Sequence, residues 1–203
     1  VFAFDMVPEL DKEFRRNISL NQLEQNIVIE RVALGDREGV VEYLYSDDTE
    51  MGNFEPEMLK DGNMDIASGS LKKGQVRMTT LDRYVAQHQI QKVDFIKVDI
   101  DGAEVPFLRG AHDTLSTKKP VIVIEVSERG QKAQGHSCAE IFIEIAKHGY
   151  KFFSVRYSLR EILPHEFSRV SKEDVLCLSS AKVHLIPELT RNLSRDELPR
   201  SEH

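Results

Sequence analysis

The sequence lacks the features of a secreted or membrane-spanning protein. Only two of its 203 residues are cysteine, Cys138 and Cys177, which is too few for a disulfide framework in a chain of this size. No apolar run approaches the roughly 20 residues that a transmembrane helix needs. The chain opens on Val1-Phe2-Ala3-Phe4 without a preceding basic segment, so we expect a strand here and no targeting peptide. These absences predict a cytoplasmic protein with reduced thiols and no membrane association.

Positive charge is also scarce. The formal net charge is −7, which argues against nucleic-acid binding because that function needs a basic face, whereas it excludes no small-molecule ligand. The composition, with 30% charged and 40% hydrophobic residues, fits a soluble chain with one sizeable core. We expect a single domain over residues 1–185 and a polar C-terminal tail over residues 186–203. The oligomeric state is not readable from the sequence.

Strand-like and helix-like segments alternate along the chain. Predicted strands cover residues 1–4, 27–34, 40–45, 76–78, 93–100, 121–126, 151–155 and 175–178. Predicted helices cover residues 9–23, a short segment capped by Thr79 or Thr80, residues 102 to about 115, and residues 138–147. Between residues 46 and 74 no period holds, which predicts a long loop and a candidate lid over the substrate. This alternation favours an α/β sandwich with a mostly parallel sheet.

Carboxylates follow several of the predicted strands, and parallel sheets bind ligands at the carboxyl ends of their strands. Asp5 ends the first strand, where it is either a ribose-binding residue or an exposed strand-end residue. Asp99 and Asp101 end the strand at 93–100, and Glu125 lies in the strand at 121–126.

The segment KVDIDGAE, residues 97–104, holds three carboxylates at a strand-to-helix turn. Asp101 and Glu104 would lie near the helix N-terminus, where the helix dipole favours negative charge, so both could serve as capping residues. Asp99 is predicted inside a buried strand end, where an unpaired carboxylate is costly. Asp99 is therefore the strongest functional candidate of the three.

This segment and the following VPFLRGA, residues 105–111, resemble the KIDVEGAE…vLrGA signature of FkbM-family methyltransferases. Further similar pieces occur in the family's order: FDMVPE at 4–9, Asn17 and Leu20-Asn21, VALGD at 32–36, TLD at 80–82, and Lys119-Pro120 with 123–126. Together they span Val1 to Val155. Two departures are mild: Met6 stands where the family usually has Pro, and Asp101 where it has Glu.

The resemblance implies a Rossmann-like class I methyltransferase sandwich with a mostly parallel sheet and an antiparallel last strand. It implies S-adenosylmethionine as the cofactor, with Asp5 on its ribose, Ala33 and Leu34 beside its adenine, and Asp36 just beyond. Asp99 would lie near the methionine end of the cofactor.

The resemblance also implies the reaction, O-methylation of a hydroxyl on a small or medium acceptor such as a sugar or a polyketide-like metabolite. Methyl transfer is a single in-line displacement, so positioning dominates and only modest base assistance is needed. Asp99 or Glu125 could accept the hydroxyl proton, and Lys97 could steer either.

The family's first strand and its glycine-rich cofactor loop are not found before Asp5, and Gly62, Gly69 and Gly74 fall in the predicted loop. We therefore expect a truncated chain in which the strands at 1–4 and 93–100 lie two strand spacings apart, about 10 Å. A non-catalytic methyltransferase-like binding module is the alternative function. A nicotinamide-dependent Rossmann enzyme is disfavoured, because it would need the same glycine loop and has no use for the carboxylate-rich turn.

Overall fold

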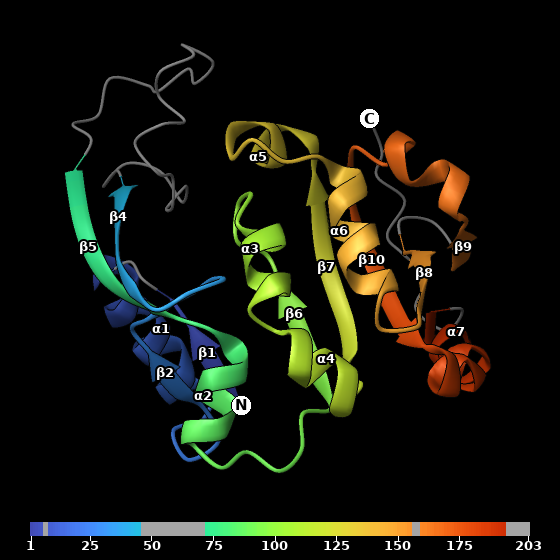
Figure 1. The fold of residues 1–203 in the computed structure, drawn as a ribbon. Helices are drawn as coiled ribbons and strands as arrows, with labels where there is room; N and C mark the ends of the chain where they lie inside the picture. Colours follow the sequence, from blue (N-terminus) through green and yellow to red (C-terminus); the bar gives the residue numbers. More distant parts are fainter. Residues whose placement is uncertain (6–7, 46–71, 156–158, 194–203) are drawn as a thin grey trace, which may run out of the picture.

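The computed structural model describes residues 1–5, 8–45, 72–155 and 159–193 (Figure 1). The strands are β1 (Phe2–Phe4), β2 (Val28–Glu30), β3 (Ala33–Leu34), β4 (Gly39–Tyr45), β5 (Lys72–Thr79), β6 (Phe95–Val98), β7 (Val121–Ser127), β8 (Tyr150–Ser154), β9 (Arg160–Ile162) and β10 (Lys172–Ser179). The α-helices are α1 (Pro8–Leu20), α2 (Leu81–Gln87), α3 (Glu104–Arg109), α4 (His112–Thr117), α5 (Glu128–Ala133), α6 (Cys138–Ala146) and α7 (Ile186–Leu193). Two 3-10 helices are η2 (Pro164–Arg169) and η3 (Ser180–Leu185).

The largest sheet has the strand order β6-β7-β10-β8-β9, and only its β6–β7 pair is parallel. The expectation of a mostly parallel sheet was therefore wrong. The cause is the position of β10, which inserts between β7 and β8 and pairs antiparallel with both. The antiparallel last strand was expected and is confirmed. Strand β9, absent from the sequence-based prediction, adds another antiparallel pair at the edge.

The remaining strands form two smaller sheets, β1-β2 and β3-β5-β4. The single strand predicted over 27–34 is split, because β2 pairs with β1 and β3 pairs with β5. Val32, between them, is only 2% exposed. Strands β1 and β6 are not paired with each other, as expected, but they belong to different sheets, and their separation stays a prediction.

The predicted loop at 46–74 is shorter than expected, because β5 begins at Lys72 and pairs antiparallel with β4. Gly74 lies inside β5 and not in a loop. A Cβ there would stand 2.3 Å from the Tyr43 ring, so the glycine makes room for this buried side chain. Gly62, Gly69 and the rest of the candidate lid lie outside the described residues.

The main core lies between the five-stranded sheet and helices α3, α4 and α6 (Figure 1). Along β7, alternate residues Ile122, Ile124 and Val126 are at most 1% exposed and face these helices. Fully burying such a side chain contributes about 1.5–3 kcal/mol each. The predicted inward residues of α6 are all fully buried: Ile141, Phe142 and Ile145.

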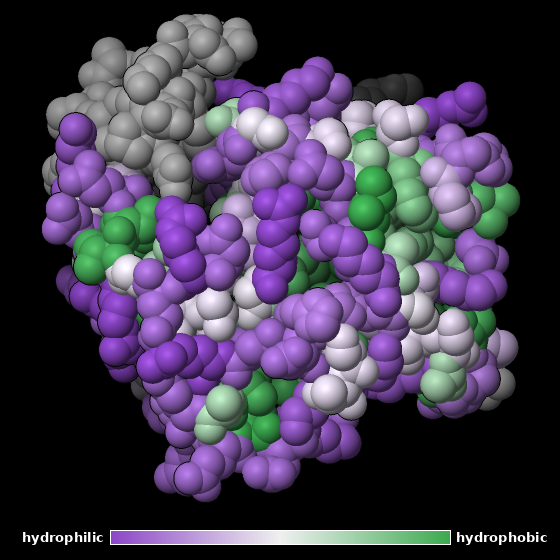
Figure 2. Space-filling model, in the orientation of Figure 1, coloured by the Kyte–Doolittle hydropathy of each residue, from purple (hydrophilic) through white to green (hydrophobic). Residues whose placement is uncertain are grey.

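The opposite face of this sheet carries a smaller cluster around Phe153, Leu176 and Leu178, which Val183 and Ile186 cover. Residues 186–193, expected in the polar tail, thus form α7, and its first residue packs onto the sheet. The face of the molecule shown in Figure 2 is mostly hydrophilic, with small separate apolar patches. In the part of the chain that the structure describes, no helix has the length and apolarity to cross a membrane.

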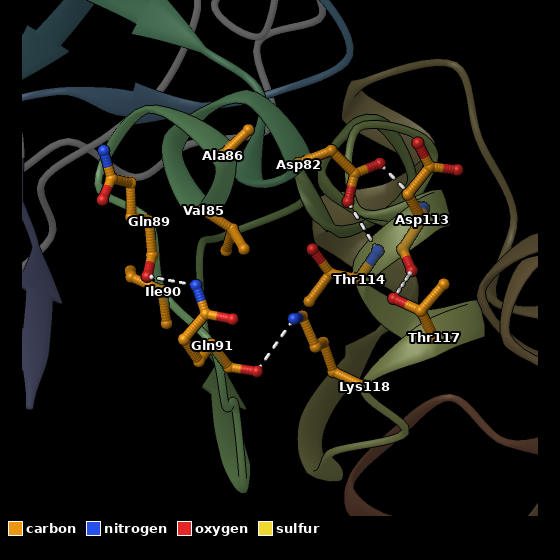
Figure 3. Close-up of a pocket in the computed structure, with 10 residues that line it drawn as sticks. All are labelled: Asp82, Val85, Ala86, Gln89, Ile90, Gln91, Asp113, Thr114, Thr117 and Lys118. Atoms are coloured by element: carbon orange, nitrogen blue, oxygen red, sulfur yellow. Dashed lines mark hydrogen bonds between the residues drawn. The ribbon is translucent and has the colours of Figure 1, made fainter.

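The helix predicted from 102 to 115 is interrupted at Gly110, which separates α3 from α4. A Cβ at Gly110 would lie 1.9 Å from the Gly35 carbonyl oxygen, so only glycine allows this contact. The carbonyl of Gly110 accepts a hydrogen bond from the backbone N–H of Asp82 (3.0 Å). The Asp82 carboxylate in turn accepts from the N–H groups of Asp113 (2.8 Å) and Thr114 (2.7 Å) at the start of α4 (Figure 3). One junction therefore fixes the end of β3, α2 and the break between α3 and α4.

Replacing Asp82 with Ala removes both hydrogen bonds that cap α4, and we expect it to lower the free energy of unfolding by about 1–2 kcal/mol. The variant Asp82→Asn keeps one acceptor oxygen and should lose less. Urea denaturation at fixed pH measures both. The control is Asp94→Ala, whose side chain is 66% exposed and pairs only at the surface with Lys92. An effect of Asp82→Ala no larger than that of the control would contradict the capping role.

Candidate active site

Four charged side chains lie near the carboxyl ends of β6 and β7, on one side of the five-stranded sheet: Lys97, Asp99, Glu125 and Asp174. Strand register aligns Lys97 with Val123 and pairs Glu125 with Asp174. Val123 belongs to the cluster on the face opposite α3 and α6. Because side chains alternate along a strand, Lys97, Glu125 and Asp174 share this face.

Lys97 bridges two carboxylates across this face. Its ammonium group donates to Asp99 Oδ2 (3.1 Å) and to Asp174 Oδ1 (2.9 Å). The Asp99 side chain is 53% exposed, so the expectation that it lies in a buried strand end was wrong. The strand β6 ends at Val98, and Asp99 already stands outside the sheet. Exposed pairs of this kind contribute at most about 1 kcal/mol to stability. Stabilisation of the fold therefore does not account for this arrangement, which favours a chemical role.

Asp174 is the residue that sequence reasoning missed. It follows Glu173 near the start of β10, and nothing in its local sequence distinguishes it from a surface acid. Only the antiparallel register of β10 on β7 places it beside Glu125 and within reach of Lys97. That register would have identified it, had the position of β10 between β7 and β8 been known.

Glu125 and Asp99 lie near each other at this edge of the sheet. Glu125 is opposite Asp174 in the strand register, and Lys97 contacts both Asp174 and Asp99. Burial raises the pKa of Glu125, and the nearby charge of Asp99 raises it further. Burial lowers the pKa of Lys97, but its hydrogen bonds to Asp174 and Asp99 outweigh this and leave it above its ordinary value. The result is a carboxyl group that holds its proton more readily than usual, beside a second carboxyl group and a fixed cation.

The turn after β6 has an unusual backbone. Asp101 has a φ of 51° and Gly102 a φ of 105°, and the first of these is uncommon for a residue with a side chain. Burial raises the pKa of the Asp101 carboxyl, as does the nearby charge of Asp99. Helix α3 begins only at Glu104, and its cap position is Ala103, which makes no side-chain cap. The expected capping role of Asp101 was therefore wrong.

Glu104 is fully buried behind this turn. Its carboxylate accepts from the backbone N–H of Ile100 (3.3 Å) and from the side-chain amide of Gln131, which is also fully buried. Burial raises the pKa of Glu104, although these hydrogen bonds oppose the rise. Glu104 therefore holds the turn from behind and does not face the charged side chains of the candidate site.

The candidate cofactor residues lie on the two smaller sheets. Asp5 directly follows β1, and its backbone N–H donates to the carbonyl of Glu30 (3.1 Å). Ala33 and Leu34 form β3, are partly buried, and Leu34 packs against the main core. Asp36 is exposed and accepts a hydrogen bond from Arg37 (3.0 Å). A strand-end carboxylate and a small apolar strand are the chemistry that ribose hydroxyls and a purine require, so these residues fit a nucleoside-containing cofactor.

A cavity of about 390 Å³ lies between α2 and α4 (Figure 3). Its lining includes Val85, Ile90 and Lys118, and the Lys118 ammonium donates to the Gln91 carbonyl (2.8 Å). Gln91 precedes β6 and Lys118 precedes β7, whereas the carboxylates follow these strands. The cavity therefore belongs to the opposite end of the sheet from the candidate site. Within the described ranges, no group of three or more His, Cys, Asp or Glu residues could hold a metal ion.

The buried carboxyl of Glu104 should make stability depend on pH. Because its pKa is raised in the folded state, the unfolded chain ionises first as pH rises. Folding stability is therefore lost from the ordinary pKa of a glutamic acid upward, until the folded-state pKa is passed. Glu104→Gln cannot ionise, so the wild type should lose stability relative to this variant as pH rises above about 4, the ordinary pKa of a glutamic acid. Urea denaturation at stepped pH measures the difference, and a difference that is constant with pH would contradict the assignment.

Comparisons with known proteins address the family. Residues 1–152 match the model of the methyltransferase FkbM domain, which is well over half of the chain. The crystal structure of methyltransferase FkbM from Methylobacillus flagellatus KT is similar with a TM-score of 0.52 and 14% sequence identity, a likeness that concerns the fold alone. The match covers 88% of this chain but only 36% of that one, so this chain spans little more than a third of its length. No curated protein matches significantly. The chain belongs to the FkbM methyltransferase family.

Proposed function

We propose that this protein is an S-adenosylmethionine-dependent O-methyltransferase that acts on a hydroxyl group of a small or medium acceptor, such as a sugar or a polyketide-like metabolite. Membership of the FkbM family supports a methyltransferase. The observation that carries the proposal further is the neighbouring carboxyl groups of Asp99 and Glu125, with Lys97 bound to Asp99, near the carboxyl ends of β6 and β7.

Residues of the smaller sheets would hold the cofactor. When bound, S-adenosylmethionine supplies a methyl group on a positively charged sulfur. Asp5 would accept hydrogen bonds from the two ribose hydroxyls, since an ionised carboxylate can bind both at once. Ala33 and Leu34 would pack beside the adenine. Asp36 would stand just beyond them, although it already contacts Arg37.

The acceptor hydroxyl would lie against the carboxyl pair. As the bound cofactor supplied its methyl group to the acceptor oxygen, the hydroxyl proton would pass to a carboxylate. Asp99 is the more exposed member and directly follows β6, whereas Glu125 holds a proton more readily because its pKa is raised. Asp99 is therefore the favoured proton acceptor, with Glu125 as the alternative. Lys97 would keep the carboxyl of Asp99 oriented and offset its charge.

The cofactor assignment is tested by calorimetric titration with S-adenosylhomocysteine, the demethylated product. We expect Asp5→Asn to weaken binding roughly 10–100-fold, because charge-assisted hydrogen bonds contribute about 1.5–3 kcal/mol. Asp94→Asn is the matched control, since this exposed acid precedes β6 at the other end of the sheet. Equal affinity of both variants would contradict the role of Asp5. Failure to bind by both this chain and a version extended upstream would favour the non-catalytic module.

The catalytic assignment is tested by methyl transfer to a panel of hydroxylated acceptors. We expect Asp99→Asn to reduce turnover roughly 10²–10⁴-fold, the usual contribution of a general base. Its stability should change little, because the Asp99–Lys97 pair is exposed. Asp113→Asn, with a side chain that is 82% exposed on α4, is the control. Retained turnover in Asp99→Asn, with turnover lost in Glu125→Gln, would instead make Glu125 the proton acceptor.

A further inference from the structure

We infer that Gln131 is a positioning residue that sets the geometry of the Asp99–Glu125 carboxyl pair. Gln131 does not touch the acceptor face itself. It lies on α5, wholly buried, and acts through the turn that follows Asp99 and through the chain that follows Glu125. The inference rests on the proposed function, in which this pair receives the acceptor's proton.

The contacts form a closed circuit between the two strand ends. From Asp99 the chain runs forward through the turn to Gly102 and Glu104. The amide of Gln131 donates to the Gly102 carbonyl (3.2 Å) and to the Glu104 carboxylate. From Gln131 the chain runs back only six positions to Glu125. Lys97 links Asp99 to Asp174, which is opposite Glu125 in the strand register, and so closes the circuit on the other face. We therefore expect a change at Gln131 to alter the separation of the two carboxyl groups.

A close backbone contact reinforces the same circuit. A Cβ on Gly102 would lie 2.4 Å from the carbonyl oxygen of Gly130, and a Cβ on Gly130 would lie 3.0 Å from the backbone nitrogen of Gly102. Ser127, which ends β7, caps α5 by accepting from the Gly130 N–H (3.4 Å). The start of α5 is thus in close contact with the turn at the point where both segments have glycine, Gly130 and Gly102. This contact holds Asp101 at its positive φ.

The chemistry of Gln131 argues that its amide has a use. Its side-chain oxygen is buried and makes no hydrogen bond within the described structure. Burying an unpartnered amide oxygen is unfavourable, and an apolar side chain of the same size would fill the space without that cost. The two hydrogen bonds donated by the amide nitrogen are the compensating gain. Both of them reach the turn that carries Asp101 and follows Asp99.

Other charged groups also surround the pair and must stay constant in a test. Lys97 on β6 and Asp174 on β10 lie beside the pair, and the charges of Asp101 and of Glu104, which is buried behind the turn, also act on Glu125. A variant at Gln131 changes none of these charges. A shift in the titration of the pair would therefore report a change of geometry, whereas a role in packing alone would leave the titration unchanged.

The experiment is a carboxyl ¹³C NMR titration of the full chain without cofactor, comparing the wild type with Gln131→Met. Methionine keeps the volume of the side chain and removes the amide. We expect the pKa of Glu125 to fall in the variant, toward that of an ordinary glutamic acid, because the repulsion from the charge of Asp99 weakens as the groups separate. Gln87→Met, exposed on α2, is the matched control and should titrate like the wild type.

A second variant keeps the inference testable if Gln131→Met does not fold. Gly130→Ala adds one methyl group at 3.0–3.2 Å from the backbone of Asp101 and Gly102, which moves the turn without changing any hydrogen-bonding group. It should lower the pKa of Glu125 in the same direction, and it decides the question if circular dichroism shows that Gln131→Met is unfolded. An unchanged Glu125 titration in the folded variants would overturn the inference. Because no cofactor is present, this result is independent of whether S-adenosylhomocysteine binds.

Discussion

Crowded negative charge at the ends of β6 and β7 is the constraint on which the rest of the candidate site depends. Asp99, Asp101, Glu104 and Glu125 all influence one another there. Like charges at such short range are unfavourable unless cations, protons or N–H groups offset them. Lys97 supplies the cation, burial and the charge of Asp99 favour the protonated form of Glu125, and Glu104 receives N–H donors in the interior. Each carboxyl group is thus accommodated in a different way, which leaves Asp99 as an exposed acceptor.

The architecture explains why the charges could be gathered there. Strand β10 runs antiparallel between β7 and β8, so its first residues lie beside the last residues of β7. The sheet therefore brings Asp174 to the same edge as Glu125, and Lys97 reaches across to it. On the other face, α5 returns from β7 to press on the turn after β6. One face of the sheet thus carries the exposed charges. On the other face, α5 fixes the backbone from which those side chains project.

Local patterns predicted the elements better than the pairing. The strand at 121–126, the inward face of α6 and the cap at Thr79 or Thr80 were correct, because each depends on residues close in sequence. The pairing of strands depends on contacts far apart in the chain, and so the insertion of β10 was not predicted. The split of the strand at 27–34 was missed for the same reason, since a segment that is apolar except at Glu30 and Arg31 does not reveal that the chain leaves one sheet at Glu30 and enters another at Ala33.

In the candidate site, the sequence-based prediction failed where it depended on burial. The position of Asp99 at a strand end was readable, but the argument that selected it assumed burial, and its side chain is 53% exposed. The buried carboxyl is Glu104, three residues after Asp101, because α3 turns back over the sheet at that point. Gln131 carried no sequence signal at all. Its importance comes only from the amide's contact with a turn 29 residues earlier in the chain.

Several family-like motifs in this chain have structural tasks, and this bears on what the family resemblance can establish. Gly35, Asp82 and Gly110 come from three separate motifs and meet in one junction that joins β3, α2 and the break before α4. Gly102, in a fourth motif, is required by the contact with α5. These residues would be needed to build the fold whether or not methyl transfer takes place. Motif matches at such positions therefore support the family and its architecture. The proposed activity would depend instead on the few residues that the fold does not need, and Asp99, exposed and outside the sheet, is the foremost candidate.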